Sequence, residues 1–232
     1  SNDAGLNFTK TAETDDIFNS AQSWYDMALT VSDSDTDVLF VGVLDIWKST
    51  DGGETWKKLK DGLPKKMGKV AIDVSPANPQ RIFANIEAEK GGVYRSDNGG
   101  KTWTQVCSDR ITITRAWYYI EVFTDPNDEN TLYVLSARAF RSIDGGKTWE
   151  RIYSGHGDYH DLWINPDNSK NMIISDDGGG EITFDNGESW SSINNMPTAQ
   201  FYRVNTDNRF PYWVYGGQQD NSSVMIQSRT SG

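Results

Sequence analysis

The sequence predicts an all-β protein, and three observations support this prediction. An eight-residue motif that ends in an aromatic ring occurs five times along the 232-residue chain. Short runs rich in β-branched and aromatic residues precede the motif, and Gly, Pro, Asn and Asp separate these runs. No stretch shows the 3.6-residue spacing of apolar side chains that is typical of an amphipathic helix.

The repeated motif, called the box below, is clearest at Ser49–Trp56, Ser96–Trp103 and Ser142–Trp149, with a looser copy at Thr183–Trp190 and a worn one at Ser1–Phe8. Its Asp or Asn stands at positions 3, 51, 98, 144 and 185, so the copies are 48, 47, 46 and 41 residues apart. That side chain can accept hydrogen bonds from the backbone of its own turn, and the glycines can adopt positive φ. The box Asp residues are therefore expected to be structural rather than catalytic.

Three predicted strands precede each complete box, and a further strand such as 102–106 follows it. They cover 27–31, 38–41 and 45–48, then 70–74, 81–84 and 92–95, then 119–123, 131–134 and 139–141, then 161–164, 171–174 and 181–183. Four short strands repeated every 46 residues or so predict a β-propeller of four-stranded antiparallel blades. Aromatic rings supply much of the core, because the chain has 9 Trp, 10 Tyr and 9 Phe but only 36% hydrophobic residues.

The two ends of the chain leave the number of blades open. Strands 201–204, 213–215 and 224–227 have no box after them, whereas the amino end offers a box and one strand, 6–10. The ends could complete one blade and close a five-bladed ring, or both could be cuts in a longer propeller. We expect a single propeller domain with blades near 27–60, 69–107, 119–153, 160–194 and 200–228, the last completed by 5–10 if the ring closes.

Charge and composition exclude several classes of partner and cofactor. The chain has 33 acidic and 22 basic side chains, a formal net charge of -11, which argues against nucleic acid and an anionic membrane surface. No run approaches the roughly 18 apolar residues of a membrane span. The single cysteine, Cys107, excludes an internal disulfide framework and a cysteine zinc site. We expect no cofactor. Because the chain begins without Met, we expect a fragment or a processed chain.

The box resembles the Asp-box, or BNR repeat, and the resemblance covers essentially the whole chain. The chain also resembles large bacterial BNR-repeat proteins labelled glycosyl hydrolase or sortilin-like, through residues 115–119, 156–163, 197–202 and 215–221. This resemblance implies an extracellular, periplasmic or cell-surface protein that handles glycans. The Arg-Ile-Pro motif of box-containing sialidases does not occur in the chain, so an enzyme would be another glycoside hydrolase. In the xyloglucanase-type enzymes, the catalytic pair comes from two facing propellers.

The expected ligand face lies opposite the boxes, where loops lead into the first strand of each blade and join the second strand to the third. The first candidate there is the segment 155–161, which holds both histidines of the chain. On an extended backbone, His156, Asp158 and His160 would share one side and could form an acid–base cluster or half a metal site. Asp176 or Asp177 could complete it. The alternative is a polar loop that satisfies its own backbone.

Two further groups complete the prediction. The loop at Gly216–Asn221 carries amides and a carboxylate that suit sugar hydroxyls, or it is simply a Gly/Asn turn. Trp24, Trp117 and Tyr159 precede first strands and could stack on sugar rings, or they could cap the core between blades. Arg115 could contact an anionic group.

A glycosidase needs two carboxyl groups roughly 5–10 Å apart. The candidate catalytic residues are Asp158, Asp161, Asp177 and Asp220. The candidate ligand-binding residues are His156, His160, Tyr159, Trp117, Trp24, Arg115, Gln218, Gln219 and Asn221. Two functions remain open: a glycan-handling, glycosidase-like module that either binds or cleaves a polysaccharide, and a non-catalytic sortilin-like scaffold for proteins or peptides.

Overall fold

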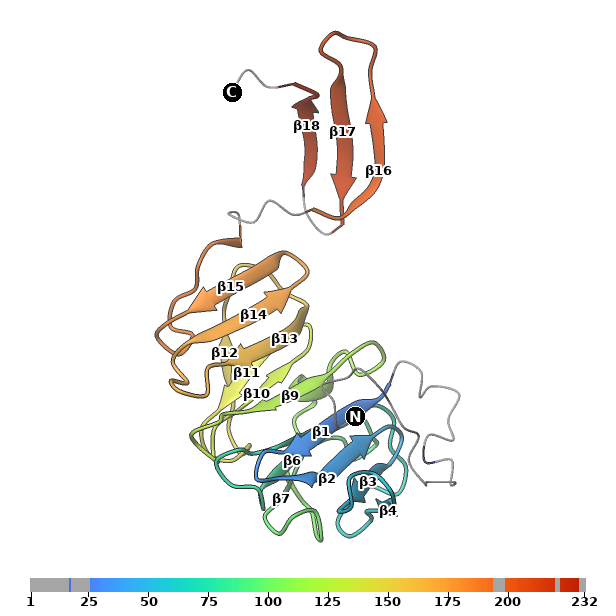
Figure 1. The fold of residues 1–232 in the computed structure, drawn as a ribbon, viewed down its shortest axis with the longest axis vertical. Coiled ribbons are helices and arrows are strands. Elements are labelled where there is room, and N and C mark those ends of the chain that lie inside the picture. The colour runs from blue at the N-terminus through green and yellow to red at the C-terminus, as the bar shows by residue number, and fades with distance from the viewer. Residues whose placement is uncertain (1–16, 18–25, 194–198, 220–221, 230–232) are drawn as a thin grey trace.

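The computed structural model describes residues 17, 26–193, 199–219 and 222–229 (Figure 1). Its strands form five antiparallel sheets, three with four strands and two with three. The fold is therefore all-β with propeller-type blades, as predicted. The predicted box at residues 1–8 and strand at 6–10 lie outside the described residues.

The strands follow one another in chain order within each sheet. The first sheet contains β1 (Ala28–Ser32), β2 (Asp35–Gly42), β3 (Ile46–Ser49) and β4 (Lys57–Lys58). The second contains β5 (Val70–Val74), β6 (Ile82–Ile86), β7 (Gly92–Ser96) and β8 (Thr104–Cys107). The third contains β9 (Glu121–Thr124), β10 (Leu132–Leu135), β11 (Ala139–Ser142) and β12 (Glu150–Ile152). The fourth contains β13 (Tyr159–Ile164), β14 (Met172–Asp176) and β15 (Gly179–Thr183), and the fifth β16 (Phe201–Thr206), β17 (Trp213–Gln218) and β18 (Ser223–Gln227).

Strand direction separates the box turns from the loops that lead into the first strands. In the first sheet, Ala28 pairs with Gly42 and Gly42 with Ile46, so β1 and β3 begin at the same end of the sheet. Leu39 pairs with Ser49 at the other end, where the box begins. The boxes therefore lie at one end of the strands, and the loops leading into β1, β5, β9 and β13, called leading loops below, lie at the opposite end.

Each box is closed by a short network of hydrogen bonds. In the first box, the Ser49 Oγ accepts from the Gly53 N–H at 2.9 Å and donates to Asp51 Oδ1 at 2.7 Å. Asp51 Oδ1 also accepts from the Thr55 N–H at 2.9 Å. The Trp56 Nε1–H donates to the Gly53 carbonyl at 3.0 Å, and Gly53 has a φ of 91° that other residues rarely adopt. These bonds confirm a structural role for the box aspartate.

The other boxes repeat this network with one exception. Asn98 takes the aspartate position in the second box, where its Oδ1 accepts from the Thr102 N–H at 2.9 Å. In the fourth box, Thr183 replaces serine and its Oγ1 accepts from the Gly187 N–H at 3.0 Å. The Trp190 Nε1–H is buried without a hydrogen-bond partner among the described residues, so the fourth box is the least complete.

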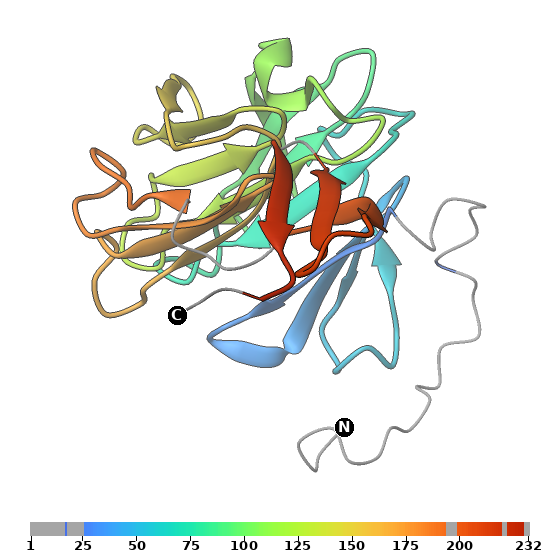
Figure 2. The ribbon, with the colours of Figure 1, turned by 90° about the horizontal axis from the view of Figure 1, so that it is seen from above.

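Apolar side chains between neighbouring sheets form the core. The clusters join the first sheet to the second around Phe40 and Trp103, the second to the third around Phe83 and Leu132, and the third to the fourth around Tyr133. Trp103 is only 4% exposed, which confirms that its ring belongs to the core. Seen from above, the first four sheets follow one another in an arc (Figure 2).

Cationic side chains link each sheet to the next box. The residue before the box serine donates to a carbonyl in the following box: Lys48 to Gly99 at 2.9 Å, Arg95 to Gly145 at 3.2 Å and Arg141 to Asn186 at 2.7 Å. Ile182 holds this position in the fourth sheet, so the series of links stops there.

The fifth sheet stands apart from the other four (Figure 1), and the described residues do not close a ring. Nearly all side chains of β16 and β18 are exposed. On the fourth sheet, a cross-strand row of Trp163, Ile173 and Ile182 is also exposed, at 53%, 44% and 42%.

Two local differences from the predicted elements occur. After Trp190, the described residues up to 193 form no fourth strand, although the Ser191 N–H still donates to the Ile182 carbonyl at 2.9 Å. A single-turn 3-10 helix, η1 (Arg110–Ile113), lies in the leading loop of β9, where no helix was predicted. Asp109 caps η1 by accepting from the Ile111 N–H at 3.0 Å.

Candidate functional site

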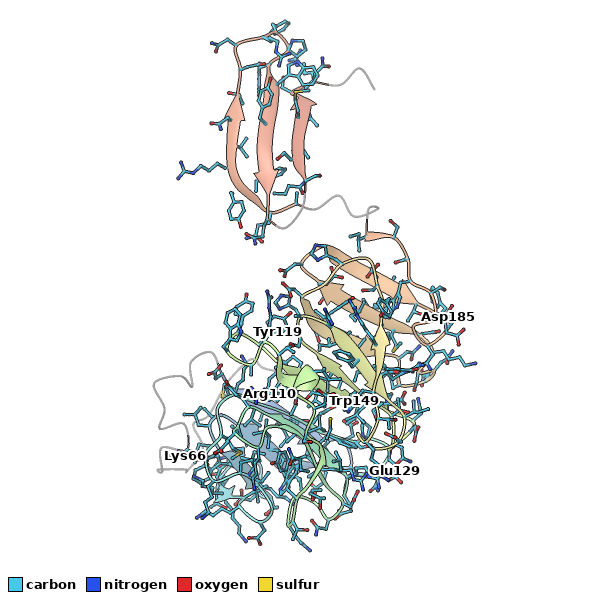
Figure 3. The ribbon with its side chains drawn as sticks, turned by 180° about the vertical axis from the view of Figure 1, so that it is seen from behind. Lys66, Arg110, Tyr119, Glu129, Trp149 and Asp185 are labelled. Carbon is cyan, nitrogen blue, oxygen red and sulfur yellow. The ribbon has the colours of Figure 1, made fainter. Side chains whose placement is uncertain are left out.

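Two leading loops meet through an ion pair. The leading loop of β9 carries Arg115, whose Nη1 lies 2.5 Å from Oδ2 of Asp158 in the leading loop of β13. Both side chains keep part of their surface in solvent, 31% for Arg115 and 26% for Asp158. The pair thus joins the third and fourth sheets at the end opposite the boxes. Figure 3 shows Arg110 and Tyr119 on the loop that supplies Arg115.

A second pair lies beside the first. The Nε2 of His160 is 2.8 Å from Oδ1 of Asp177, which follows β14. The backbone connects the two pairs, because the Asp177 N–H donates to the Asp158 carbonyl at 3.2 Å. The His160 ring lies on the Tyr119 ring, with centroids 4.4 Å apart and planes 31° apart. The structure therefore brings together Arg115, Asp158, His160 and Asp177 from the predicted set.

The predicted one-sided arrangement of His156, Asp158 and His160 is wrong. Asp158 has a φ of 60°, which turns the backbone out of the extended conformation just before β13. The register of β13 also shifts between Tyr159 and Asp161. His156 instead turns to its own loop, with Nδ1 2.9 Å from the Gly157 carbonyl oxygen. Across the described ranges, no three His, Cys, Asp or Glu side chains are grouped as metal ligands would be.

For Tyr159, the structure shows the alternative, a ring in the core between blades. Its side chain is only 3% exposed and packs in the core between the third and fourth sheets. Its hydroxyl donates to the His156 carbonyl at 2.7 Å and accepts from the Ser154 Oγ at 3.0 Å. From its place in the core, Tyr159 therefore fixes the shape of the leading loop of β13.

Two exposed rings project from the leading loop of β9. Trp117 is 73% exposed and Tyr118 is 54% exposed, and their ring centroids lie 5.9 Å apart with planes 31° apart. The Arg115 guanidinium carbon is 5.8 Å from the Trp117 ring centroid. We call Trp117 and Tyr118 the aromatic platform. The neighbouring Tyr119 anchors it, because the Tyr119 hydroxyl donates to the buried Ser136 carbonyl at 2.9 Å.

The first strands themselves carry a titratable group that was not predicted from the sequence. The pKa of Glu121 in β9 is raised to about 7, mainly by burial; the charge of Lys69 opposes the shift and the charge of Asp161 adds to it. Lys69, just before β5, lies 3.1 Å from Asp26 and donates to the Tyr118 carbonyl at 3.0 Å. Residues from four sheets thus contribute charge near the platform. The available signal was a lone carboxylate inside an otherwise apolar and aromatic run, Tyr119–Phe123.

The remaining predicted residues lie elsewhere or outside the described ranges. Asp161 is exposed, and its Oδ1 accepts from the Leu162 N–H at 2.8 Å. Gln218 and Gln219 lie at the end of β17, in the separate fifth sheet, so the structure does not bring them to the two ion pairs. Trp24, Asp220 and Asn221 lie outside the described residues.

Asp176, the alternative to Asp177 in the prediction, serves the turn between β14 and β15. Its Oδ1 accepts from the N–H groups of Gly178 and Gly179 at 2.8 Å and 3.0 Å. Burial raises the pKa of this carboxyl, and the nearby Glu181 adds to the rise. Asp176 therefore holds the backbone turn between β14 and β15.

Comparison with known families identifies the repeat. A family model for the BNR/Asp-box repeat matches residues 47–58, 94–105 and 140–151, each of which covers a box with parts of its flanking strands. No curated protein sequence matches the chain. Within the described ranges, no helix has the length and apolar character needed to cross a membrane.

One solved structure shows the same fold at low sequence identity, and others are similar in part. An ancestral GH74 enzyme superposes with a TM-score of 0.53 at 14% identity, covering 85% of this chain and 30% of that one. The GH74 enzyme of Niastella koreensis gives 0.49 at 17% identity, covering 72% and 38%, and YCF48 from Cyanidioschyzon merolae gives 0.48 at 12%, covering 82% and 63%. The chain thus spans less than a third of the ancestral enzyme. It carries three BNR/Asp-box repeats, and its sheets have the form of β-propeller blades.

Proposed function

We propose that the leading-loop face binds a glycan and that the aromatic platform contacts its sugar rings. The observation that carries this proposal is the exposure of Trp117 and Tyr118 side by side, next to the Arg115–Asp158 pair. Large exposed rings are costly unless a ligand covers them, and sugar rings stack on such faces through their C–H edges. The charged pair beside the rings offers donors and acceptors to sugar hydroxyls.

The contacts of the carboxylates favour binding over cleavage. Asp158 is held by Arg115, Asp177 by His160, and Asp161 accepts from its own strand. Glu121 is the carboxyl whose pKa, about 7, suits proton donation at neutral pH. A hydrolase would need a second free carboxylate across the bond, and the xyloglucanase-type enzymes that the chain resembles obtain theirs from a facing propeller. The GH74 enzyme that shares the fold supports a glycan as the ligand class.

The proposal is tested by binding of xyloglucan and other neutral polysaccharides, measured by affinity electrophoresis and calorimetry. Trp117→Ala is expected to weaken binding about tenfold, since stacked rings of this kind contribute on the order of 1 kcal/mol or more. Phe184→Ala is the matched control, because Phe184 is also 73% exposed but lies in the box of the fourth sheet. It should leave affinity unchanged.

A parallel hydrolysis assay separates the outcomes. Binding without product release supports a glycan-binding module of an exported protein. The proposal would be contradicted if no polysaccharide binds, or if Trp117→Ala and Phe184→Ala lose affinity equally. Either result would favour the alternative of a scaffold for proteins or peptides. Turnover that Glu121→Gln abolishes would show that the chain is itself a hydrolase.

A further inference from the structure

We propose that a lysine-lined groove at the box end of the molecule binds an acidic oligosaccharide, that is, a short glycan bearing uronate or sulfate groups. The groove has a volume of about 680 Å³ and lies between β4 with its box and the box of the second sheet. This volume falls within the range of roughly 300–1,000 Å³ that is typical of small-ligand sites. We call it the lysine groove.

The charge of the lysine groove is opposite to that of the whole chain. Five lysines line it, Lys48, Lys57, Lys58, Lys60 and Lys101, whereas the chain carries a net charge of -11. Asp61 is the one carboxylate among the lining residues. The groove is therefore a concentrated basic patch on an acidic protein, and anions are attracted to it specifically.

Three of the five ammonium groups are available to a ligand. Lys58 is paired with Asp45, and Lys48 donates to the Gly99 carbonyl. The other three, Lys57, Lys60 and Lys101, are exposed and have no ionic or hydrogen-bond partner within the part of the chain that the structure describes. Burial and the charge of Lys101 both lower the pKa of Lys48, which shows that the positive charges in the groove repel one another. A bound anion would relieve this repulsion.

Comparison of the repeats within the chain shows that the blade does not require these lysines. In the first three repeats, the third residue after the box tryptophan is apolar: Leu59, Val106 and Ile152. The positions of Lys57, Lys58 and Lys60 are occupied by Thr104, Gln105 and Cys107 in the second repeat and by Glu150, Arg151 and Tyr153 in the third. The apolar position serves the fold, whereas the lysines are particular to the first repeat and need another explanation.

The other lining groups select the kind of anion. The Trp56 ring and the hydroxyl-bearing Thr50 and Thr55 line the groove together with the lysines. Rings and hydroxyl groups beside cations suit a ligand that carries C–H faces, hydroxyls and negative charge at once, as an acidic sugar does. A long polyanion such as nucleic acid would extend beyond the groove onto a surface of net negative charge and be repelled. The lysine groove does not depend on the glycan-binding proposal, because it lies at the opposite end of the strands.

Calorimetric titration of the whole chain tests the inference with defined probes. The probes are a galacturonate hexamer, a heparin hexasaccharide, a neutral xylose hexamer, a poly-glutamate peptide and a single-stranded oligonucleotide. Both acidic sugars are expected to bind, with affinity that falls as salt rises, and the neutral sugar is not. The triple variant Lys57→Glu, Lys60→Glu, Lys101→Glu should lose about tenfold or more in affinity for them.

Lys147→Glu is the matched control. Lys147 occupies in the third box the position that Lys101 occupies in the second, is also exposed, and does not line the groove. It should leave binding unchanged. If the triple variant does not fold, the corresponding glutamine variant replaces it. Absence of binding by either acidic sugar, equal losses in the control, or equally tight binding of poly-glutamate or the oligonucleotide would each overturn the assignment.

Discussion

Glu121 differs from the aspartates of the leading-loop face in its contacts. Burial raises the pKa of the Glu121 carboxyl, and no basic side chain among the described residues is in direct contact to offset this rise. Asp158 and Asp177, by contrast, each contact a basic group. Sequence reasoning placed these two aspartates near one another, since it could assign their loops to the same end of the blades. It could not find Glu121, because the burial of a first-strand carboxylate depends on how closely the neighbouring sheets approach.

The shifted pKa of Glu121 predicts a specific dependence of stability on pH. The folded state holds the proton more tightly than the unfolded state, in which the pKa is near 4.5. The contribution of the protonated Glu121 carboxyl to the free energy of unfolding is therefore complete below about pH 4.5 and is lost as pH rises through about 7. Glu121→Gln cannot ionise, so the wild type should lose on the order of 1–2 kcal/mol relative to this variant between about pH 5 and about pH 8. Urea unfolding at both pH values measures it.

The exposed Glu89→Gln is the control for this measurement and should retain the pH dependence of the wild type. An identical dependence in Glu121→Gln and the wild type would show that the Glu121 carboxyl ionises as it does in the unfolded chain.

The box aspartate gives a second prediction at this scale. Hydrogen bonds from Thr55 and Ser49 lower the pKa of Asp51 to about 2. The stabilising effect of these bonds is present above the ordinary pKa of 3.8 and is lost as pH falls through about 2. Asp51→Asn should keep the melting temperature at neutral pH, because Asn98 bonds the equivalent Thr102 in the second box. Its Oδ1 accepts from the Thr102 N–H at 2.9 Å, and its Nδ2 donates to the Thr102 hydroxyl at 2.8 Å.

When the pH is lowered, the melting temperature of Asp51→Asn should also fall less than that of the wild type. Asp51→Ala should melt at a lower temperature than the wild type at every pH. Thermal melts followed by circular dichroism compare the three proteins. Equal melting of the alanine and asparagine variants at neutral pH would contradict a bonding role for this position.

At the scale of strands and turns, the box is the element that sequence reasoning predicted best. Its bonds are local, within five or so residues, and Gly at positive φ together with Asp or Ser specifies them directly. The strands were also predicted within a few residues, since turn signals separate them. Tyr159 was misplaced, because a ring before a strand can point to solvent or to the core and only the packing of β13 on the third sheet decides which.

The packing between sheets predicts the cost of removing a box ring. Trp103→Ala should destabilise the protein by about 3–5 kcal/mol, because the ring is almost fully buried in the cluster between the first two sheets. Chemical unfolding measures this change. Trp117→Ala, at a ring that is 73% exposed, should cost less than about 0.5 kcal/mol. A small effect of Trp103→Ala would mean that the sheets do not pack through the box tryptophans.

At the scale of the whole molecule, the two ends of the strands differ in chemistry. The leading loops carry exposed rings and paired charges, and the box end carries the lysine groove. Sequence reasoning predicted which end would hold each set of loops, because strand direction follows from the repeat. It could not predict the lysine groove, since the groove requires β4 and the box of the next sheet to face each other. The series of cationic links from Lys48 to Asn186 holds that spacing between the first four sheets.

The central claim, that a glycan covers the aromatic platform, is tested most directly by hydrogen–deuterium exchange with and without a neutral xyloglucan oligosaccharide. We predict slower exchange in the leading loops at 115–120 and 156–161, where the platform and the two ion pairs lie, and unchanged exchange in the four described boxes. Unchanged exchange in both leading loops at a saturating concentration of the oligosaccharide, or protection confined to the box turns, would contradict the claim.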